Sequence, residues 1–262
     1  MGGTNIFSGK SFQEITREER PFCFLLGHSL LSSRKTRQRF VSLVGKKSIS
    51  LDENNMQVFV EVAALRDYWR ELGNPRTYCD KTHSARVKVL RALLKHQGQA
   101  EDMFEHYAFF WSAGIGSKLH SPGRWSVKGM ESELGADPDA VTTRERLRAL
   151  RALKLAFNAK PDFLIISGRE ALMIEAKVES GIGSYGRSGE NQVKTQVLIA
   201  DLLMKYVPSF RGIEIVQLTL GKAVSESKKT SFDLTWNQIS ECVDNPEVDN
   251  FTRSGLAGLA ST

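Results

Sequence analysis

Three charged side chains stand at the ends of two apolar runs near the middle of the sequence. Residues 160–180 read KPDFLIISGREALMIEAKVES, in which Asp162 precedes the run FLII, and Glu175 and Lys177 close the run ALMI. Two carboxylates held side by side repel each other, and a divalent cation between them removes that conflict. Carboxylate oxygens are ligands that Mg²⁺ accepts, with water and phosphate oxygens completing its coordination. With the lysine alongside, these residues are suited to metal-dependent chemistry on a phosphate group.

A two-residue turn between the apolar runs predicts how the charged residues are positioned. Gly168-Arg169 suits a type II′ hairpin turn because glycine takes a positive φ without strain. A turn centred there places Asp162 opposite Glu175, and directly opposed Cβ atoms lie roughly 4.5–5.5 Å apart. Side chains alternate between the two faces of a strand, so Lys177 shares the face of Glu175. The alternative is a hairpin whose charges are each solvated separately at the edge of a sheet.

The same residues resemble the motif of a known family. Pro161-Asp162, followed along the chain by Glu175-Ala176-Lys177, resembles the motif of the PD-(D/E)xK nuclease superfamily, which has a restriction-endonuclease-like fold. The resemblance covers roughly residues 125–220. It implies a metal-dependent nuclease in which Asp162 and Glu175 bind Mg²⁺, which Mn²⁺ can replace. Lys177 would then orient or activate the attacking water, so all three are candidate catalytic residues.

The resemblance also implies an acidic residue on the helix before the hairpin and a glutamine on the helix after it. Glu131 and Glu133 are candidates for the acid, and Glu131 is preferred as the third metal ligand because it lies nearer the apolar stripe. Gln192 and Gln196 share one helical face, and Gln196, closer to the apolar side, is the preferred catalytic glutamine. Three further acids become candidates if the core includes the N-terminal half: Glu18, Glu19 and Glu61.

The elements that must position these residues follow from apolar periodicity and from turn and capping signals. Between residues 135 and 160, where the resemblance implies a first strand, the sequence shows only a helix, and the segment MQVFVEV at 56–62 is another source for that strand. Strands are expected at 56–62, in the two runs of the hairpin and at 213–220. Helices are expected at 21–44 with a break near Ser32-Ser33, 62–72, 84–97, 100–112, 126–135, 142–157, 192–206 and 236–243.

These elements predict an α/β fold with a restriction-endonuclease-like core, a mixed β-sheet flanked by helices, and a mainly helical N-terminal half. We expect residues 1–120 to form a helical region for recognition or partner binding. Residues 121–243 would form the nuclease core, and residues 244–262 a flexible tail.

Composition and charge narrow the class of partner. The 262 residues are 41% hydrophobic and 25% charged, with a net charge of +6, which favours a polyanionic partner. Residues 144–160 carry six basic side chains against one acidic and lead directly into Asp162.

No apolar run approaches the ~20 residues of a membrane helix. Cys23, Cys79 and Cys242 show no metal or disulfide spacing, so a reducing cytoplasm is the expected location.

The sequence therefore predicts a Mg²⁺-dependent endonuclease that hydrolyses DNA. The resemblance implies products with a 5′-phosphate and a 3′-hydroxyl, and a role in restriction or anti-phage defence. Two alternatives stay open: a non-catalytic nucleic-acid-binding or assembly module with a nuclease-like fold, and a nuclease directed at RNA, which nothing in the sequence excludes. A homodimer is one option for the oligomeric state.

Overall fold

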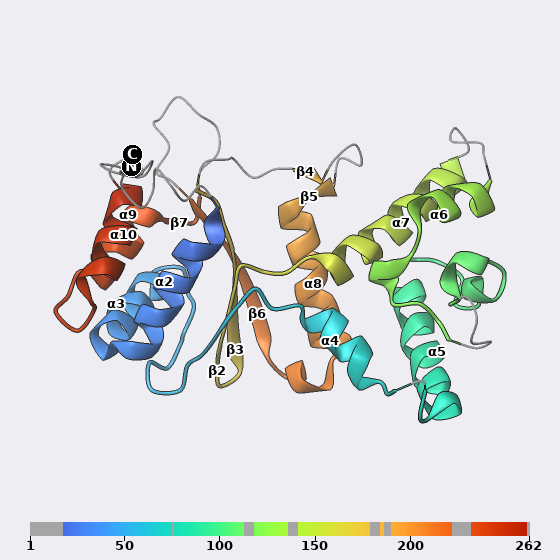
Figure 1. Ribbon diagram of the computed structural model, residues 1–262, viewed down its shortest axis with the longest axis horizontal. Coiled ribbons are helices and arrows are strands. Elements are labelled where there is room, and N and C mark those ends of the chain that lie inside the picture. Colours follow the sequence, from blue (N-terminus) through green and yellow to red (C-terminus); the bar gives the residue numbers. More distant parts are fainter. Residues whose placement is uncertain are drawn as a thin grey trace, which may run out of the picture. The chain divides into compact units, whose positions relative to one another are not determined.

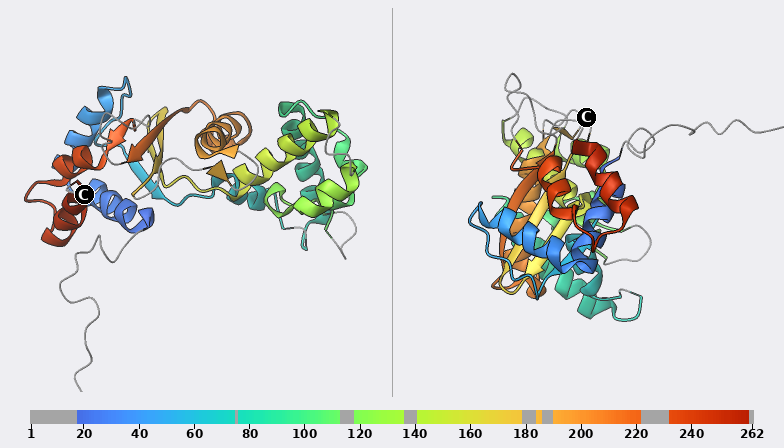
Figure 2. Two further views of the ribbon diagram at one scale, coloured as in Figure 1. Left: turned by 90° about the horizontal axis from the view of Figure 1, so that it is seen from above. Right: turned by 90° about the vertical axis from the view of Figure 1, so that its left-hand side faces the viewer.

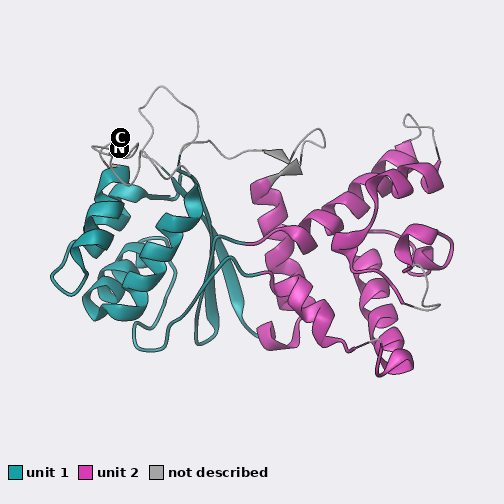
Figure 3. Ribbon diagram, viewed as in Figure 1, with its two compact units in different colours: residues 1–62, 161–183, 212–262 teal, residues 63–160, 184–211 magenta. Residues whose placement is uncertain are grey.

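The computed structural model describes residues 18–74, 76–112, 118–135, 141–178, 184–185, 190–221 and 232–260. Within these ranges the chain is an α/β protein with a five-stranded mixed sheet and a mainly helical N-terminal half (Figure 1). It divides into two compact units, which Figure 3 colours separately. Unit 1 consists of residues 1–62, 161–183 and 212–262, and unit 2 consists of residues 63–160 and 184–211.

The sheet of unit 1 has the strand order β1-β2-β3-β6-β7. The strands are β1 (Gln57–Val60), β2 (Phe163–Ser167), β3 (Glu170–Ala176), β6 (Glu214–Gly221) and β7 (Leu234–Thr235). The first three strands pair antiparallel, and β3, β6 and β7 pair parallel. The continuous apolar runs of β2 and β3 suit central strands covered on both faces. Within the predicted strand segment 56–62, residues Gln57–Val60 form β1 and pair with β2.

The hairpin of β2 and β3 has the predicted register. Phe163 pairs with Ile174, and Ser167 pairs with Glu170, so the turn is centred on Gly168 and Arg169. Gly168 has a φ of 62°, the positive value that the first central position of a type II′ turn requires. The local choice of glycine thus sets the alignment of the two strands over their whole length.

Four helices of unit 1 lie on one side of its sheet: α2 (Glu19–Ser32), α3 (Arg34–Gly45), α9 (Trp236–Val243) and α10 (Asn250–Ala260) (Figures 1 and 2). The predicted break near Ser32-Ser33 is confirmed, because Ser33 separates α2 from α3 and its hydroxyl accepts a hydrogen bond from the amide of Thr36. The buried core of this unit combines residues of both layers, among them Phe22, Leu26, Phe40, Phe163, Ile165, Leu172, Ile174, Leu220 and Trp236.

The observed units differ from the predicted domains. The predicted boundary at residue 120 falls inside unit 2, and the one at residue 243 falls inside unit 1. The prediction also separated β1 and α2 from the hairpin, whereas these segments share one core. Residues 250–260, which we expected in a flexible tail, form α10. Leu256 and Leu259 of this helix are buried in the core of unit 1, and their spacing places them on one helical face. Two well-placed leucines thus anchor a segment that is otherwise poor in large apolar residues.

Unit 2 is built mainly from five helices: α4 (Ala64–Glu71), α5 (Cys79–His96), α6 (Val127–Leu134), α7 (Val141–Asn158) and α8 (Gln192–Tyr206). Each was predicted, and α8 has the predicted bounds. Shorter elements of this unit are η3 (Pro122–Arg124), β4 (Ser184–Tyr185), β5 (Glu190–Asn191) and η5 (Pro208–Phe210). Its buried side chains include Trp69, Leu90, Leu94, Phe110, Trp125, Leu150, Leu153, Phe157 and Leu203.

The helix predicted at residues 100–112 is wrong. This segment forms two short 3₁₀ turns, η1 (Met103–Glu105) and η2 (Ala108–Phe110). The carboxylate of Glu133 accepts hydrogen bonds from the amides of Ala108 and Phe109, so these amides do not bond to carbonyls one helical turn earlier. The aromatic side chains instead pack on Trp125, whose ring centroid lies 4.9 Å from that of Phe110. Tertiary packing and a side-chain cap override the local helical pattern here.

Among the described residues, no helix is long and apolar enough to cross a membrane. Cys23, Cys79 and Cys242 are all free thiols, and two of them are buried.

The hairpin turn gives a direct test of its backbone. We expect Gly168→Ala to lower the free energy of unfolding by about 1 kcal/mol or more, because alanine resists the positive φ although nothing lies within 4 Å of its Cβ. Gly45→Ala is the matched control: its Cβ also meets open space, but Gly45 ends α3 and has no positive φ. Urea unfolding should show a loss for the first variant only, and equal stabilities would contradict the assigned turn.

Candidate active site

Asp162 lies immediately before β2, beside the end of β3. Its Oδ2 accepts a hydrogen bond of 2.7 Å from the amide of Ala176, so the side chain bridges the two neighbouring strand ends. Within the described residues its other carboxylate oxygen, Oδ1, accepts no hydrogen bond. One oxygen is therefore fixed by the backbone, and the other is available to a ligand.

Glu175 and Lys177 follow each other on one face at the end of β3. The Lys177 Nζ donates a hydrogen bond of 2.8 Å to Glu175 Oε1. Both side chains are buried, with 6% of the Glu175 side chain and 10% of the Lys177 side chain exposed. The backbone of Lys177 is also held, because its amide donates to Leu220 and its carbonyl accepts from the Trp236 indole, each at 2.8 Å. The ammonium group therefore sits on a rigid section of backbone.

Burial and neighbouring charge shift the pKa of Asp162 upward to about 7. Burial is the largest cause, and the charge of Glu175 is the second, with a smaller contribution from Glu19. The hydrogen bond from Ala176 and the charge of Lys177 act in the opposite direction but do not outweigh them. The carboxylates of Asp162 and Glu175 therefore interact electrostatically, as their predicted positions on neighbouring strands require.

The pKa of Lys177 is raised despite its burial. Burial alone would lower it, and this is the largest single effect. The hydrogen bond and charge of Glu175, together with the charges of Asp162 and Glu19, outweigh burial. Lys177 is therefore a stable cation within an acidic surrounding.

Two more acids contribute to this acidic surrounding. Burial raises the pKa of the Cys23 thiol, and the charges of four carboxylates raise it further: Asp162, Glu19, Glu175 and Glu61. Glu19 lies in the first turn of α2. Glu61 directly follows β1, and its amide donates to the carbonyl of Asp162 at 3.3 Å. Glu61 has a φ of 58°, which is unusual for a residue other than glycine and is often found at functional sites.

Glu19 and Glu61 are two of the acids that the sequence offered on the condition that the core includes the N-terminal half. The pairing of β1 with β2 and the packing of α2 on the sheet fulfil this condition. Glu18, the third of them, is exposed at the start of α2. The sequence signal for Glu61 was the strand pattern MQVFVEV directly around it, and no comparable signal distinguished Glu19 from Glu18.

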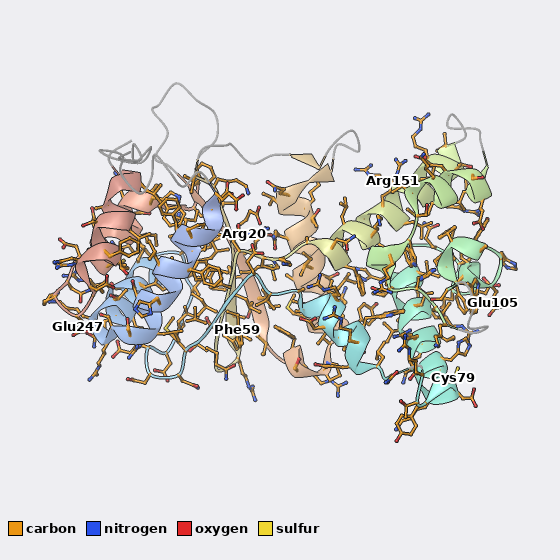
Figure 4. All side chains as sticks on the ribbon, in the orientation of Figure 1. Arg20, Phe59, Cys79, Glu105, Arg151 and Glu247 are labelled. Atoms are coloured by element: carbon orange, nitrogen blue, oxygen red, sulfur yellow. The ribbon has the colours of Figure 1, made fainter. Side chains whose placement is uncertain are left out.

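Glu131 and Gln196 both belong to unit 2, whereas Asp162, Glu175 and Lys177 belong to unit 1. Glu131 lies on α6 and forms an ion pair with Arg151 of α7, the latter labelled in Figure 4. Gln196 is buried in α8, with 1% of the residue exposed. Their roles as metal ligand and catalytic residue stay predictions. Glu133, the other candidate on α6, is occupied in capping η2.

The donor set at the strand ends fits Mg²⁺. In the ranges that the structure describes, no three Asp, Glu, His or Cys side chains gather closely enough to enclose a metal completely. Mg²⁺ does not need such an enclosure, because it usually retains several waters and is bound through one or two carboxylates and substrate phosphates. Asp162 and Glu175 would supply these two carboxylates, and a dication would cancel the repulsion that raises the pKa of Asp162.

The raised pKa predicts a pH-dependent change in stability on Asp162→Asn. Asp162 takes up a proton near pH 7 in the folded state and near pH 4 when unfolded, so wild-type stability falls as the pH rises between these values. In EDTA we expect the variant to exceed the wild type at pH 8 by up to about 4 kcal/mol in free energy of unfolding. The difference should vanish near pH 4, as measured by urea unfolding.

Asp244→Asn provides the control for this measurement. Asp244 belongs to the same unit and its side chain is 80% exposed, so its substitution should change stability little at either pH. Addition of Mg²⁺ at pH 8 should stabilise the wild type and not Asp162→Asn, because only the wild type retains both carboxylates. If Asp162→Asn were no more stable than the wild type at pH 8, the negative charge of Asp162 would not destabilise the folded state.

Comparisons of this chain with protein-family models, with curated proteins and with solved structures gave no match. The likeness to the PD-(D/E)xK superfamily consequently rests on the motif and on the geometry of the hairpin that carries it.

Proposed function

We propose that this protein is a Mg²⁺-dependent nuclease of the PD-(D/E)xK type, with a restriction-endonuclease-like core, that hydrolyses phosphodiester bonds in DNA. The observation that carries the proposal is the arrangement at the ends of β2 and β3. There the buried pair Glu175–Lys177 stands beside Asp162, whose pKa is raised to about 7 by burial and by the charge of Glu175. Repulsion between buried acids destabilises a fold, so such an arrangement points to a cation that the site is built to bind.

Each of the three residues has a distinct part in this chemistry. Asp162 and Glu175 would hold Mg²⁺, which supplies Lewis-acid stabilisation of the charge that develops on the phosphate. The Lys177 Nζ retains its proton at neutral pH because its pKa is raised, so it serves as a hydrogen-bond donor and a positive charge. It would orient the attacking water or stabilise the negative charge on the phosphate oxygens, and it would not act as a general base.

Charge supports a nucleic-acid substrate. The net charge of +6 and the basic residues of α7 would supply phosphate contacts that give affinity independent of sequence. DNA is the proposed substrate on the strength of the resemblance, which also implies 5′-phosphate ends and a role in restriction or anti-phage defence. An RNA substrate is a separate arm of the test below.

Two substitutions on one strand test the assignment. Glu175→Gln removes a proposed metal ligand at one end of β3, whereas Glu170→Gln alters the other end, where Glu170 accepts from the amide of Ser50. With plasmid, linear DNA and RNA as substrates, we expect Mg²⁺-dependent cleavage that EDTA abolishes. Glu175→Gln and Lys177→Met should each reduce the cleavage rate by roughly 100-fold or more, and Glu170→Gln should retain it.

Three results would decide against the proposal or redirect it. Cleavage that survives both Glu175→Gln and Lys177→Met would remove these residues from the mechanism. Cleavage of RNA alone would replace the substrate. Binding of nucleic acid without any Mg²⁺-dependent cleavage would indicate a non-catalytic module with a nuclease-like fold.

A further inference from the structure

A cavity of about 170 Å³ in unit 2 is lined by positive charge. Its walls come from α4, α5, Ser112, residues 119–124 and the end of α7. Among the described residues no Asp or Glu lines it, whereas four arginines and a histidine do: Arg66, Arg70, Arg86, Arg124 and His120. Such a concentration of guanidinium groups is costly without a counter-charge, because the like charges repel one another.

Three of these arginines have no acidic partner among the described residues. Arg70 pairs with Asp67 at 3.3 Å, but Arg66, Arg86 and Arg124 form no ion pair with any residue that the structure describes. By contrast, Arg91, on the same helix as Arg86, pairs with Glu105 at 3.2 Å. The cavity is therefore a place where arginine charge is left uncompensated by the protein itself.

Two arginine donors at the cavity are also buried without a partner. The Nε atoms of Arg66 and Arg86 are both inaccessible and make no hydrogen bond. The Arg86 guanidinium lies over the ring of Trp69, 5.4 Å from its centroid, which fixes its plane. Burial, followed by the charge of Arg124, lowers the pKa of Arg86, and the same two causes lower the pKa of His120. An anion in the cavity would offset the charge of these guanidinium groups and relieve their repulsion.

We propose that this cavity binds a phosphate group, either of a free small phosphate or at the phosphorylated end of a nucleic acid. Its volume is below the roughly 300–1,000 Å³ of sites for drug-sized ligands, so it suits a single small anionic group. Guanidinium forks match the oxygens of phosphate. Ser121 and Ser112 also line the cavity, and the Ser112 Oγ lies 3.2 Å from the His120 Nδ1. Trp69 and Phe157, which line the cavity, are buried, whereas the lining residue Arg124 is exposed, so the rest of a larger molecule can extend past Arg124 into solvent.

The inference goes beyond the proposed hydrolysis, because every residue of the cavity belongs to unit 2. The phosphate has two chemical sources: a free small phosphate, or the phosphorylated end of a nucleic acid. Phosphate binding can be measured in EDTA, where the proposed cleavage does not occur. The binding proposal and the nuclease proposal can therefore fail independently of each other.

The test is isothermal titration calorimetry of the full chain in EDTA with three probes. These are inorganic phosphate, a 5′-phosphorylated oligonucleotide and the same oligonucleotide without its phosphate. We expect Arg86→Gln and Arg124→Gln each to weaken binding of the phosphate-bearing probes by roughly tenfold or more. Arg91→Gln, on the same helix as Arg86 but outside the cavity, should leave binding unchanged. Arg124 is exposed, so its variant tests the proposal even if Arg86→Gln fails to fold.

The probes also distinguish the sources. A phosphorylated oligonucleotide that binds at least tenfold tighter than its unphosphorylated form, with Arg124→Gln removing the preference, identifies a nucleic-acid end. Arginine-dependent binding of inorganic phosphate without that preference identifies a free small phosphate. In either case the pKa of His120, measured by NMR titration, should rise when the protein is saturated with inorganic phosphate. The proposal would be overturned if neither inorganic phosphate nor the phosphorylated oligonucleotide bound. It would also be overturned if Arg86→Gln and Arg124→Gln left the binding of both probes unchanged.

Discussion

The alignment of β2 against β3 is the constraint on which the candidate site depends. A two-residue turn at Gly168-Arg169 fixes this alignment, and the alignment places Asp162 beside the end of β3. Because side chains alternate along a strand, a slip of one residue would send Glu175 and Lys177 to the opposite face. That face carries Phe163 and Ile174 in the core under the helices of unit 1, where two charges could not be accommodated. The apolar core and the acidic site thus select the same register.

The site also shows how a fold can tolerate an arrangement that weakens it. Asp162, Glu175, Glu19 and Glu61 raise the pKa of the Cys23 thiol beyond the effect of burial, while Lys177 and Arg20 supply positive charge among the described residues nearby. The surrounding core is large and apolar, and it includes Trp236, whose indole bonds to the carbonyl of Lys177. Stability gained in the core offsets the electrostatic cost at the strand ends, which is a common relation between scaffold and functional site.

Local signals allowed a substantial part of this structure to be predicted from the sequence. The hairpin, its register, the bounds of α8 and the break at Ser33 follow from glycine, capping and apolar periodicity, which act over a few residues. The helix predicted at 100–112 is wrong because Glu133 and Trp125, distant in sequence, determine the backbone there. The partition into units was missed for the same reason, since the pairing of β1 with β2 joins segments a hundred residues apart. At the site, Asp162, Glu175 and Lys177 were accessible through a local motif, whereas Glu19 depends on the packing of α2.

The interleaving of the two units has a consequence for how the protein is made. Unit 1 combines residues 1–62, 161–183 and 212–262, and its sheet is complete only when β6 has paired with β3 and β7 with β6. A nascent chain emerging from the ribosome therefore carries the acidic strand ends before the last strands and the Trp236 helix exist to enclose them. Contacts of such long sequence separation form slowly. The surroundings of the candidate site are therefore complete only after β6, β7 and the Trp236 helix have been translated and have packed on β3 and its neighbours.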